Sequence, residues 1–355
     1  MNVINYQEAF SVFTNHLDNY IIEPVNGGLI NNSYRVTNTD TKNAFLLQQI
    51  NKEVFKRPED LQHNYITLWH YTEFEFTGFF MPAPIMYDDS NSLFIDNNGN
   101  YWRGFEFINN AYSPLVAEKA QQGKATAKIF GKFTACLNEL NINELKVVIP
   151  DFHNLSFRYQ QFEDALKTEI YERLSLALPV IDELKNRERY MHFFEIITES
   201  DEFKKRVMHH DAKIANVLFD KKSNKVICPV DFDTTMPGYY FSDLGDMIRS
   251  MACSYDENHK KFEKLDIRKS FYKAIVDGYM KAMKKELTPS EAKYIHFSGI
   301  IMIYMQALRF ITDYLNGDTY YKTGYPGQNL DRSINQLTLL QRLEKFLLGE
   351  YNFRI

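Results

Sequence analysis

Short apolar runs alternate with turn-forming segments over the first fifty residues of the chain. The runs YIIEPV, SYRVT and AFLLQQI occupy residues 20–25, 33–37 and 44–50. Residues 26–32, which contain two glycines and three asparagines, and the sequence NTDTKN at 38–43 separate these runs. Strands favour such apolar runs and turns favour Gly, Asn and Asp, so the pattern predicts three strands joined by a loop and a turn.

A helix and a hairpin are expected in the rest of this region. Pro58 suits the first turn of a helix that continues through about Tyr71, with two acidic residues near its positive end. Farther along, the runs at 93–96 and 101–108 flank an Asn-Gly turn. This arrangement predicts a β-hairpin.

Beyond residue 110 the spacing of apolar residues becomes helical. The pattern predicts long helices over four ranges, 115–140, 157–174, 268–287 and 330–348. The capping box TPSE at 288–291 predicts a further helix through about Tyr314, and a β-rich island interrupts at 207–233. We therefore expect an α+β fold with a small β-rich N-terminal lobe, residues 1–108, and a large, mainly helical C-terminal lobe, residues 109–355.

Composition narrows the classes of protein to consider. The 41 basic and 46 acidic side chains leave a net charge of −5, which argues against nucleic acid or an anionic membrane as the main partner. The three cysteines share no metal-ligand spacing and suit a reducing compartment. The N-terminus has no signal-peptide pattern, and the most apolar stretch, 299–310, is far shorter than the ~20 residues of a spanning helix. We expect a cytoplasmic protein.

The segment HHDAKIANVLFDKKSNKVICPVDFD carries the candidate chemistry. Asp211 and Asn216 are five residues apart, and Asp231 follows after a predicted hairpin. Phosphoryl transfer needs a carboxylate to orient the attacking hydroxyl, and oxygen ligands to hold Mg²⁺ against nucleotide phosphates. Each residue alone could cap a turn, but together they match the D-x4-N pattern of protein kinases and indicate catalysis.

Around these residues the chain resembles a known superfamily. The segments that carry the resemblance are His209-x-Asp211-x4-Asn216, Val230-Asp231-Phe232-Asp233 and the run from Gly238 to Asp246. They are similar to the aminoglycoside phosphotransferase/choline kinase superfamily, which has a protein-kinase-like, two-lobe fold. Other segments resemble one branch, the N-acetylhexosamine 1-kinase-like sugar kinases, at 27–37, 46–51, 149–154, 231–238 and 308–318. The similarity runs from about residue 20 to residue 340.

The resemblance implies an enzyme that uses ATP and Mg²⁺. It implies that Asp211 is the catalytic base and that Asn216 and Asp231 bind Mg²⁺. It further implies that Asp243 braces the catalytic loop through the loop backbone, with His209 as a second structural residue.

Nucleotide contacts are implied for the N-terminal lobe. Residues 26–32 would cover the phosphates, and residues 106–108 would form the hinge beside the adenine. The candidate nucleotide-binding residues are Gly27, Gly28, Asn31, Gln48, Glu106 and Ile108. Taken alone, the two glycines could equally form an ordinary hairpin turn.

Two positions depart from the pattern of kinases. Kinases place a Lys on the third strand, where this chain has Gln48 or Gln49, and an amide brings no charge to a phosphate. His210 occupies a position where many relatives have Gly. We interpret Trp102 and Arg103, on a predicted strand, as packing within the lobe.

The residues that bind the acceptor are harder to predict from the sequence. Arg309 lies on an apolar helix, where an unpaired charge is costly, so we expect it to face either a polar cleft or a structural partner such as Asp313. Tyr321, in a tyrosine-rich loop, suits a sugar, although core packing is an equal alternative. His153 is a candidate for substrate contact or an ordinary loop histidine.

Three hypotheses follow. The leading one is phosphorylation of the anomeric hydroxyl of a sugar such as an N-acetylhexosamine. The second changes the acceptor to an aminoglycoside, choline or homoserine, although a cationic acceptor would favour an acidic face and the residues beyond 300 are mixed polar and aromatic. The third is a nucleotide-binding pseudokinase, for which Gln48 is the only support.

Overall fold

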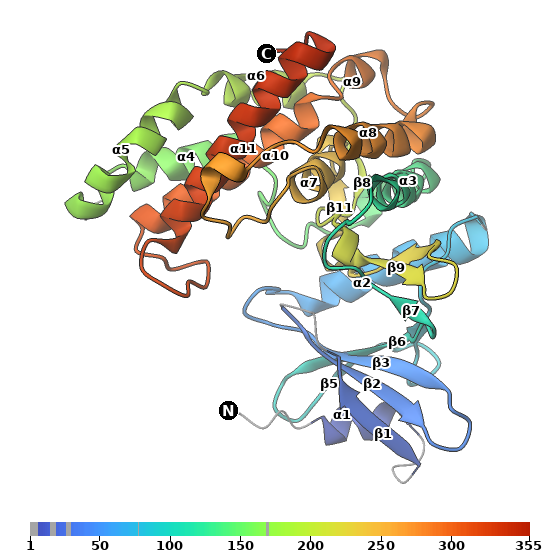
Figure 1. The fold of residues 1–355 in the computed structure, drawn as a ribbon. Coiled ribbons are helices and arrows are strands. Elements are labelled where there is room, and N and C mark those ends of the chain that lie inside the picture. The colour runs from blue at the N-terminus through green and yellow to red at the C-terminus, as the bar shows by residue number, and fades with distance from the viewer. Residues whose placement is uncertain (1–5, 15–18, 26–29, 77, 168–169) are drawn as a thin grey trace. The chain divides into compact units, whose positions relative to one another are not determined.

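The computed structural model describes residues 6–14, 19–25, 30–76, 78–167 and 170–355, and the chain folds into two compact units. The first unit contains Met1–Tyr112, Glu139–Pro150 and Leu218–Met236. The second unit contains Ser113–Asn138, Asp151–Val217 and Pro237–Ile355. Each unit is assembled from segments that are far apart in the sequence, and Figure 1 labels most of their helices and strands. A lobe boundary at residue 108 stays a prediction.

A six-stranded antiparallel sheet dominates the first unit. Its order is β1-β2-β3-β6-β4, with β5 also paired to β6. The strands are β1 (Tyr20–Pro24), β2 (Asn32–Asn38), β3 (Ala44–Gln49), β4 (Pro84–Ile85), β5 (Leu93–Ile95) and β6 (Tyr101–Glu106). The three N-terminal strands and the β5–β6 hairpin that the sequence predicts are confirmed.

The two faces of this sheet differ in character. One face carries the apolar core of Phe10, Val36, Leu47 and Trp102, where Phe10 belongs to the helix α1 (Gln7–Phe13). Trp102 is fully buried there, so its interpretation as packing is confirmed. Because side chains alternate along a strand, the other face carries Gln48, Arg103 and Phe105.

The helix α2 (Pro58–His70) covers part of that second face. It begins with Pro58 in its first turn, as the sequence predicts, and continues into a short π-helical turn over Tyr71–Glu75. The Tyr65 ring of α2 packs 4.6 Å from the Phe105 ring, centroid to centroid. Tyr65 also contacts Phe232 of the 3-10 helix η4 (Phe232–Thr234), which brings a distant segment of chain beside α2.

A second, three-stranded sheet contains part of the motif-bearing segment at residues 209–233. Its order is β10-β9-β7, formed by β7 (Ala111–Tyr112), β9 (Val217–Asp220) and β10 (Val226–Pro229). β9 and β10 make the hairpin that the sequence predicts between Asn216 and Asp231. The remaining short element of the first unit is the 3-10 turn η2 (Ile142–Glu144).

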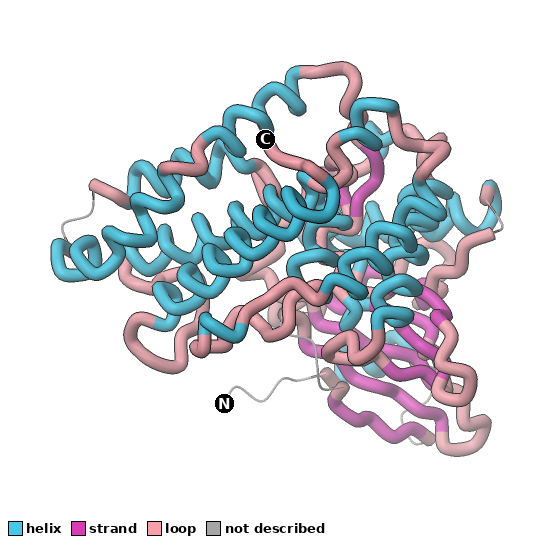
Figure 2. The backbone as a smooth tube through the Cα atoms, turned by 45° about the horizontal axis from the view of Figure 1, so that its top comes forward, coloured by secondary structure: helices cyan, strands magenta, loops and turns pink. Residues whose placement is uncertain are grey.

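The second unit is mainly helical, as Figure 2 shows. Its helices are α3 (Ala120–Cys136), α4 (Leu155–Ala165), α5 (Tyr171–Lys185), α6 (Arg189–Glu199), α7 (Phe241–Met251), α8 (Lys269–Met283), α9 (Pro289–Lys293), α10 (Phe297–Leu315) and α11 (Gln328–Tyr351). Its short elements are β8 (Arg206–Met208), β11 (Met236–Gly238) and the 3-10 turns η3 (Ile214–Asn216) and η5 (Phe262–Lys264). The strands β8 and β11 pair with each other.

The helix α10 is the centre of this unit. Almost all of its side chains are buried, and it packs against α4, α7 and α11. Gly245 of α7 permits the close α7–α10 contact, because a Cβ there would lie 2.2 Å from the Ser298 carbonyl oxygen. No helix in the described part of the chain is long and apolar enough to cross a membrane.

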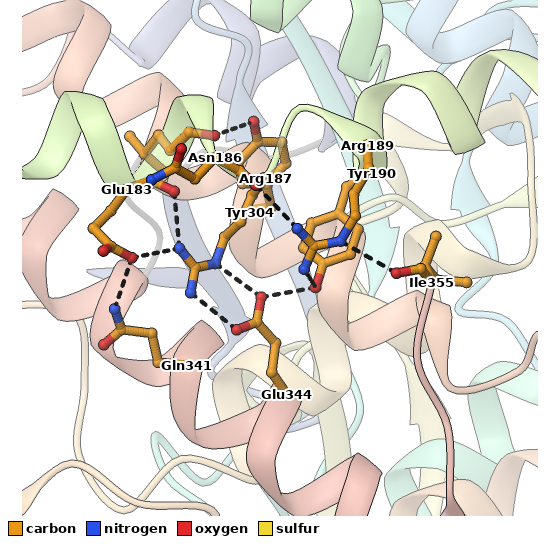
Figure 3. A network of polar contacts seen from close by, with 10 residues as sticks. Glu183, Asn186, Arg187, Arg189, Tyr190, Tyr304, Gln341, Glu344 and Ile355 are labelled. Atoms are coloured by element: carbon orange, nitrogen blue, oxygen red, sulfur yellow. Dashed lines mark hydrogen bonds and ion pairs between the residues drawn. The ribbon is translucent and has the colours of Figure 1, made fainter.

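A polar network fastens α5, α6 and α11 together (Figure 3). Arg187 donates to both carboxylate oxygens of Glu344 at 2.8 and 3.0 Å and to Glu183 at 2.6 Å. The Tyr190 hydroxyl donates to the same Glu344 at 2.7 Å. The charges are half-buried and each has several partners, so the network constrains how these helices pack.

Three of the predicted helices are wrong in extent. The predicted helix over 157–174 is two helices, because α4 ends at Ala165 and α5 begins at Tyr171. The capping box of Thr288 and Glu291 is confirmed, but its helix ends at Lys293. There the Tyr294 carbonyl accepts from Phe297 N in a tight turn and also from the Tyr240 hydroxyl, so α10 starts separately. Residue 115 is not helical either, since α3 begins at Ala120.

Candidate active site

A buried loop after β8 holds Asp211 in the second unit. The two carboxylate oxygens of Asp243 accept hydrogen bonds from the backbone N–H groups of His209 at 3.0 Å and His210 at 2.7 Å. The His209 ring accepts from the Asp211 N–H at 3.3 Å and packs edge-on against Phe130. These contacts fit the prediction that Asp243 and His209 hold the Asp211 loop in place. That structural role remains a proposal.

The Asp243 carboxyl is fully buried at the start of α7. Burial raises its pKa to about 7, and the two backbone N–H groups of the loop oppose that rise. The loop needs this anchor because His210 has φ 64°, in the left-handed region that favours glycine. Gly adopts this conformation without strain, so the Gly that the family resemblance implies here would suit the backbone that His210 adopts.

Asp211 has two polar neighbours in the same unit. Its Oδ2 accepts from Lys213 Nζ and from Asn216 Nδ2, both at 2.8 Å. Burial raises the pKa of Asp211, but Lys213, His209 and Asn216 outweigh burial and hold the pKa below its usual value. Asp211 is therefore an ionised carboxylate at neutral pH, the form that accepts a proton.

The amide nitrogen and the amide oxygen of the Asn216 side chain point in different directions. Its amide nitrogen donates to both the side chain and the main-chain carbonyl of Asp211, at 2.8 and 2.9 Å. The amide oxygen therefore points away from Asp211, in an orientation suited to a cation. Lys213, two residues after Asp211, is a functional candidate that the sequence reasoning missed, although its spacing from Asp211 was a visible signal.

Asp231 belongs to the first unit. It lies two residues after the end of β10, is exposed, and adopts φ 64° and ψ 60°, again in the left-handed region. Residues other than Gly hold such a conformation at a cost of roughly 1–3 kcal/mol, and these conformations gather at functional sites. Within the described residues, no group of three or more His, Cys, Asp and Glu side chains could hold a metal by itself.

Two of the predicted nucleotide residues, Asn31 and Gln48, contact a buried ion pair in the first unit. Arg103 pairs with Asp233, and its Nε and Nη2 also donate to Gln48 Oε1 at 3.0 and 2.6 Å. Asn31 donates to the second Asp233 oxygen at 2.6 Å. Arg103 is only 2% exposed, so its side chain packs inside this unit as the sequence predicts, at the centre of a polar network.

The other predicted nucleotide residues are described only in part. Gly27 and Gly28 lie outside the described residues. Glu106 ends β6, where its N–H donates to the Ala83 carbonyl at 2.8 Å, and Ile108 follows two residues later, half-buried. An adenine contact by Glu106 or Ile108 remains a proposal.

The three predicted acceptor residues lie close together in the second unit. The Arg309 guanidinium lies 5.6 Å from the ring centroids of both Phe152 and Tyr321. His153 stacks on Phe152, and its Nδ1 lies 3.2 Å from Nδ1 of His210, the neighbour of Asp211 in the chain. A continuous run of contacts thus leads from the Asp211 loop to Arg309.

The ion pair between Arg309 and Asp313, which the sequence offered as a structural partner, is not formed. Asp313 accepts instead from the backbone N–H groups of residues 319–321, at 2.8–3.0 Å, and from the Asn329 amide. In the part of the chain that the structure describes, Arg309 forms no ion pair. Its only polar contact with a side chain there is a long hydrogen bond of 3.4 Å to Gln306.

A second arginine, which the sequence reasoning missed, joins this group. Arg158 of α4 donates to the Phe152 carbonyl at 3.3 Å, and its Nε is buried without a hydrogen-bond partner among the described residues. Burial and the nearby Arg309 lower its pKa to about 10. Burial, His210 and the same two arginines hold the pKa of His153 well below its usual value. The surroundings of His153 are therefore cationic. No motif or spacing in the sequence indicated that Arg158 would belong to this group.

Comparison with known proteins identifies the class. The model of the phosphotransferase enzyme family (APH) matches residues 21–262, which is more than half of the chain, so the protein belongs to that family. It is a phosphotransferase for the alcohol group of a small molecule, and kinases of this family use ATP. This favours an enzyme over a pseudokinase.

Several solved structures share the fold. One is the microcompartment-associated aminopropanol kinase, with 13% identity, 97% of both chains covered and a TM-score of 0.60. Another is spectinomycin phosphotransferase in complex with ADP and spectinomycin, with 13% identity, 96% of this chain and 98% of that chain covered, and a TM-score of 0.59. A third is choline kinase from Cryptosporidium parvum, with 16% identity, coverage of 94% and 92%, and a TM-score of 0.54. At these identities the likeness concerns the fold, and the predicted α+β, protein-kinase-like fold is confirmed.

Proposed function

We propose that the protein transfers the γ-phosphoryl group of ATP to a sugar, at the anomeric hydroxyl of an N-acetylhexosamine. The hydroxyl oxygen attacks the γ-phosphorus, the bond to ADP breaks, and the hydroxyl proton passes to Asp211. The lowered pKa of Asp211 supports this role, because a base must be ionised at the working pH. Lys213 balances the charge of Asp211 beside the reacting atoms.

Asn216 and Asp231 would hold Mg²⁺. Their amide and carboxylate oxygens are hard ligands of the kind Mg²⁺ prefers, and phosphate oxygens and water would complete its coordination. The orientation of the Asn216 oxygen and the exposure of Asp231 both fit this assignment. When bound, Mg²⁺ neutralises charge on the nucleotide phosphates.

The observation that carries the acceptor class is Arg309, which lies among aromatic rings and forms no ion pair with any residue that the structure describes. A guanidinium fork can donate to two neighbouring sugar oxygens or to an acetamido carbonyl. The rings of Phe152 and Tyr321 offer apolar faces against which a sugar ring can stack. His153 joins this group to the Asp211 loop through His210, which supports a sugar hydroxyl lying over Asp211.

An amino-alcohol acceptor is the second candidate. The names of relatives, an aminopropanol kinase and a choline kinase, favour it. The charges oppose it, because a substrate ammonium would meet both Arg158 and Arg309. At roughly 6 Å and an effective dielectric constant near 20, each such pair would repel by about 3 kcal/mol. A neutral or anionic acceptor avoids this cost.

The test is an acceptor panel with Mg²⁺ and ATP. We expect N-acetylglucosamine or N-acetylgalactosamine to support ADP release, and phosphorus NMR to identify the product as the anomeric phosphate. The matched methyl glycosides, in which the anomeric oxygen is blocked, should give no product. Choline, ethanolamine, 1-amino-2-propanol and homoserine serve as competing acceptors. If they turn over while the sugars do not, the sugar proposal is wrong.

The metal assignment needs a separate readout. ADP affinity should rise when Mg²⁺ is added to the wild-type protein. In Asp231→Ala and in Asn216→Ala that gain should shrink or vanish, while affinity in EDTA stays the same. An unchanged gain would show that other residues hold the metal. The exposed Asp89→Ala is the control for removal of a carboxylate.

A further inference from the structure

The third strand of the sheet lacks the lysine that kinases use for nucleotide phosphates. Gln48 occupies the corresponding part of β3, and its direct partner across the β3–β6 register is Arg103. Directly paired residues of antiparallel strands point to the same face, so both side chains leave the face that carries Leu47 and Trp102. A cation is therefore present at this place in the sheet, one strand away from where kinases carry it.

Arg103 is held rigidly by its neighbours. Gln48 Oε1 accepts from two guanidinium nitrogens, at 3.0 and 2.6 Å, and the Gln48 amide nitrogen donates to Ser33 at 3.0 Å. Nη2 also donates to Asp233, and the second oxygen of Asp233 accepts from Asn31. Kinases likewise anchor their third-strand lysine with a carboxylate while it serves the phosphates.

One donor group of Arg103 is left over. Its Nη1 is buried and has no hydrogen-bond partner among the described residues. Buried polar groups are nearly always paired, so an orphaned charged donor calls for an explanation such as a missing ligand. The residues bonded to the guanidinium or its partner indicate which ligand this is. Asn31 belongs to the segment 26–32 that is predicted to cover the phosphates, and Asp233 lies two residues after Asp231, a predicted metal ligand.

We propose that Arg103 is the phosphate-binding cation of the nucleotide site and replaces the third-strand lysine. Gln48 acts as a positioning residue that orients the guanidinium, and Asp233 anchors it. The ligand class is the di- or triphosphate of a nucleotide. This inference rests on the use of ATP by the family and not on the sugar, so it is independent of the acceptor proposal.

The competing explanation is a purely structural ion pair. Replacing Arg103 alone would leave Asp233 buried without a partner and could unfold the sheet. Two double variants avoid this problem. Arg103→Gln with Asp233→Asn removes both charges and keeps groups that can hydrogen-bond. Arg103→Gln with Gln48→Lys moves the cation to the opposite strand, where kinases have it.

Binding of ADP and of adenosine, measured by calorimetry in EDTA, separates the two explanations. Adenosine lacks phosphates, and EDTA removes any contribution from Mg²⁺. We expect Arg103→Gln/Asp233→Asn to weaken ADP binding roughly 10- to 150-fold and to leave adenosine binding unchanged. Arg103→Gln/Gln48→Lys should recover most of the loss. The exposed Arg57→Gln, which also removes an ion-paired arginine of this unit, should change neither affinity.

Three results would overturn the proposal. The first is wild-type ADP affinity in Arg103→Gln/Asp233→Asn, which makes the pair structural. The second is an equal loss for ADP and adenosine, which indicates a general distortion of the site. The third is a folded Arg103→Gln/Gln48→Lys, checked by thermal melting, that binds ADP no better than the variant without the cation.

Discussion

The Asp243 carboxylate accepts a 2.7 Å hydrogen bond from the backbone N–H of His210, a residue held at φ 64°. A side chain in the left-handed region costs roughly 1–3 kcal/mol, so the loop needs attachments that hold it there. A second bond, from His209 N–H to the same carboxylate, ties the adjacent residue. Because Asp211 is the next residue in the chain, its position depends on Asp243.

Loss of this anchor should therefore affect stability and activity together. In Asp243→Ala the N–H groups of His209 and His210 become buried without a partner, at a cost of about 1–3 kcal/mol each. We expect a clearly lower melting temperature and greatly reduced turnover. Asp277→Ala, which removes an exposed carboxylate in the same unit, should melt like the wild type. A wild-type melt for Asp243→Ala would argue against bracing.

Gly238 offers a test of the His210 ring position. A Cβ at residue 238 would lie 2.5 Å from His210 Cε1 and 2.6 Å from Nε2, so Gly238→Ala must displace that ring. We expect the contact between His210 and His153 to break and the Michaelis constant for the acceptor to rise. Gly349→Ala is the matched control, because a Cβ there meets nothing within 4 Å, and it should be neutral or slightly stabilising. Unchanged acceptor kinetics in Gly238→Ala would separate His210 from the acceptor site.

The catalytic prediction concerns Asp211 itself. Asp211→Asn keeps the shape of the side chain but cannot accept a proton, so turnover should fall by ~10²–10⁴. Folding should persist, because Lys213, the partner of Asp211, is partly exposed and can be solvated. ADP affinity should also persist, since the proposed role of Asp211 is toward the acceptor and not the nucleotide. Near wild-type turnover in Asp211→Asn would assign the base elsewhere.

Much of the fold could be predicted from the sequence because the signals are local. The three N-terminal strands follow from apolar runs separated by turn residues, and the capping box at Thr288 follows from residues three apart. The break before α10 could not be predicted. At the break, the Tyr294 carbonyl accepts a hydrogen bond from the hydroxyl of Tyr240, which is 54 residues away in the chain. The apolar spacing continues through that break.

The residues of the candidate site likewise fall into those that a local motif predicts and those that only the folded chain brings together. Asp211 and Asn216 belong to a short motif and can be found from their spacing alone. The role of Arg103 could not, because its ion-pair partner Asp233 is 130 residues away and strand pairing brings the two together. Arg158 was missed for a related reason, since only the packing of α4 brings it near Arg309.

Arg309 is the residue on which the acceptor proposal depends most. A lost hydrogen bond from a charged group costs about 1.5–3 kcal/mol, so Arg309→Ala should lower kcat/KM for the sugar roughly 10- to 150-fold. The Michaelis constant for ATP should hardly change. Arg309→Lys should recover only part of the loss, because an ammonium lacks the guanidinium fork. Unaltered sugar kinetics together with a large loss of stability would make Arg309 a structural residue.

The pH dependence of stability should carry a contribution from His296, far in sequence from the catalytic motif. Burial lowers its pKa from 6.5 to about 4, in a setting where Nδ1 contacts the Tyr272 hydroxyl at 2.7 Å and the ring packs near Tyr351. Above pH 6.5 the histidine is neutral in the folded and unfolded states, so its contribution is fully present. As the pH falls below 6.5, only the unfolded chain gains the proton, and the folded state is disfavoured until its own pKa near 4 is reached.

The free energy of unfolding should thus lose up to about 1.4 kcal/mol per pH unit through this side chain between pH 6 and pH 4.5. Urea unfolding of the wild type and of His296→Gln at several pH values measures the difference. Gln keeps an acceptor for Tyr272 but does not titrate, so the variant should show the shallower dependence on pH. Equal slopes in His296→Gln and the wild type would mean that His296 does not contribute to the acid sensitivity of the fold.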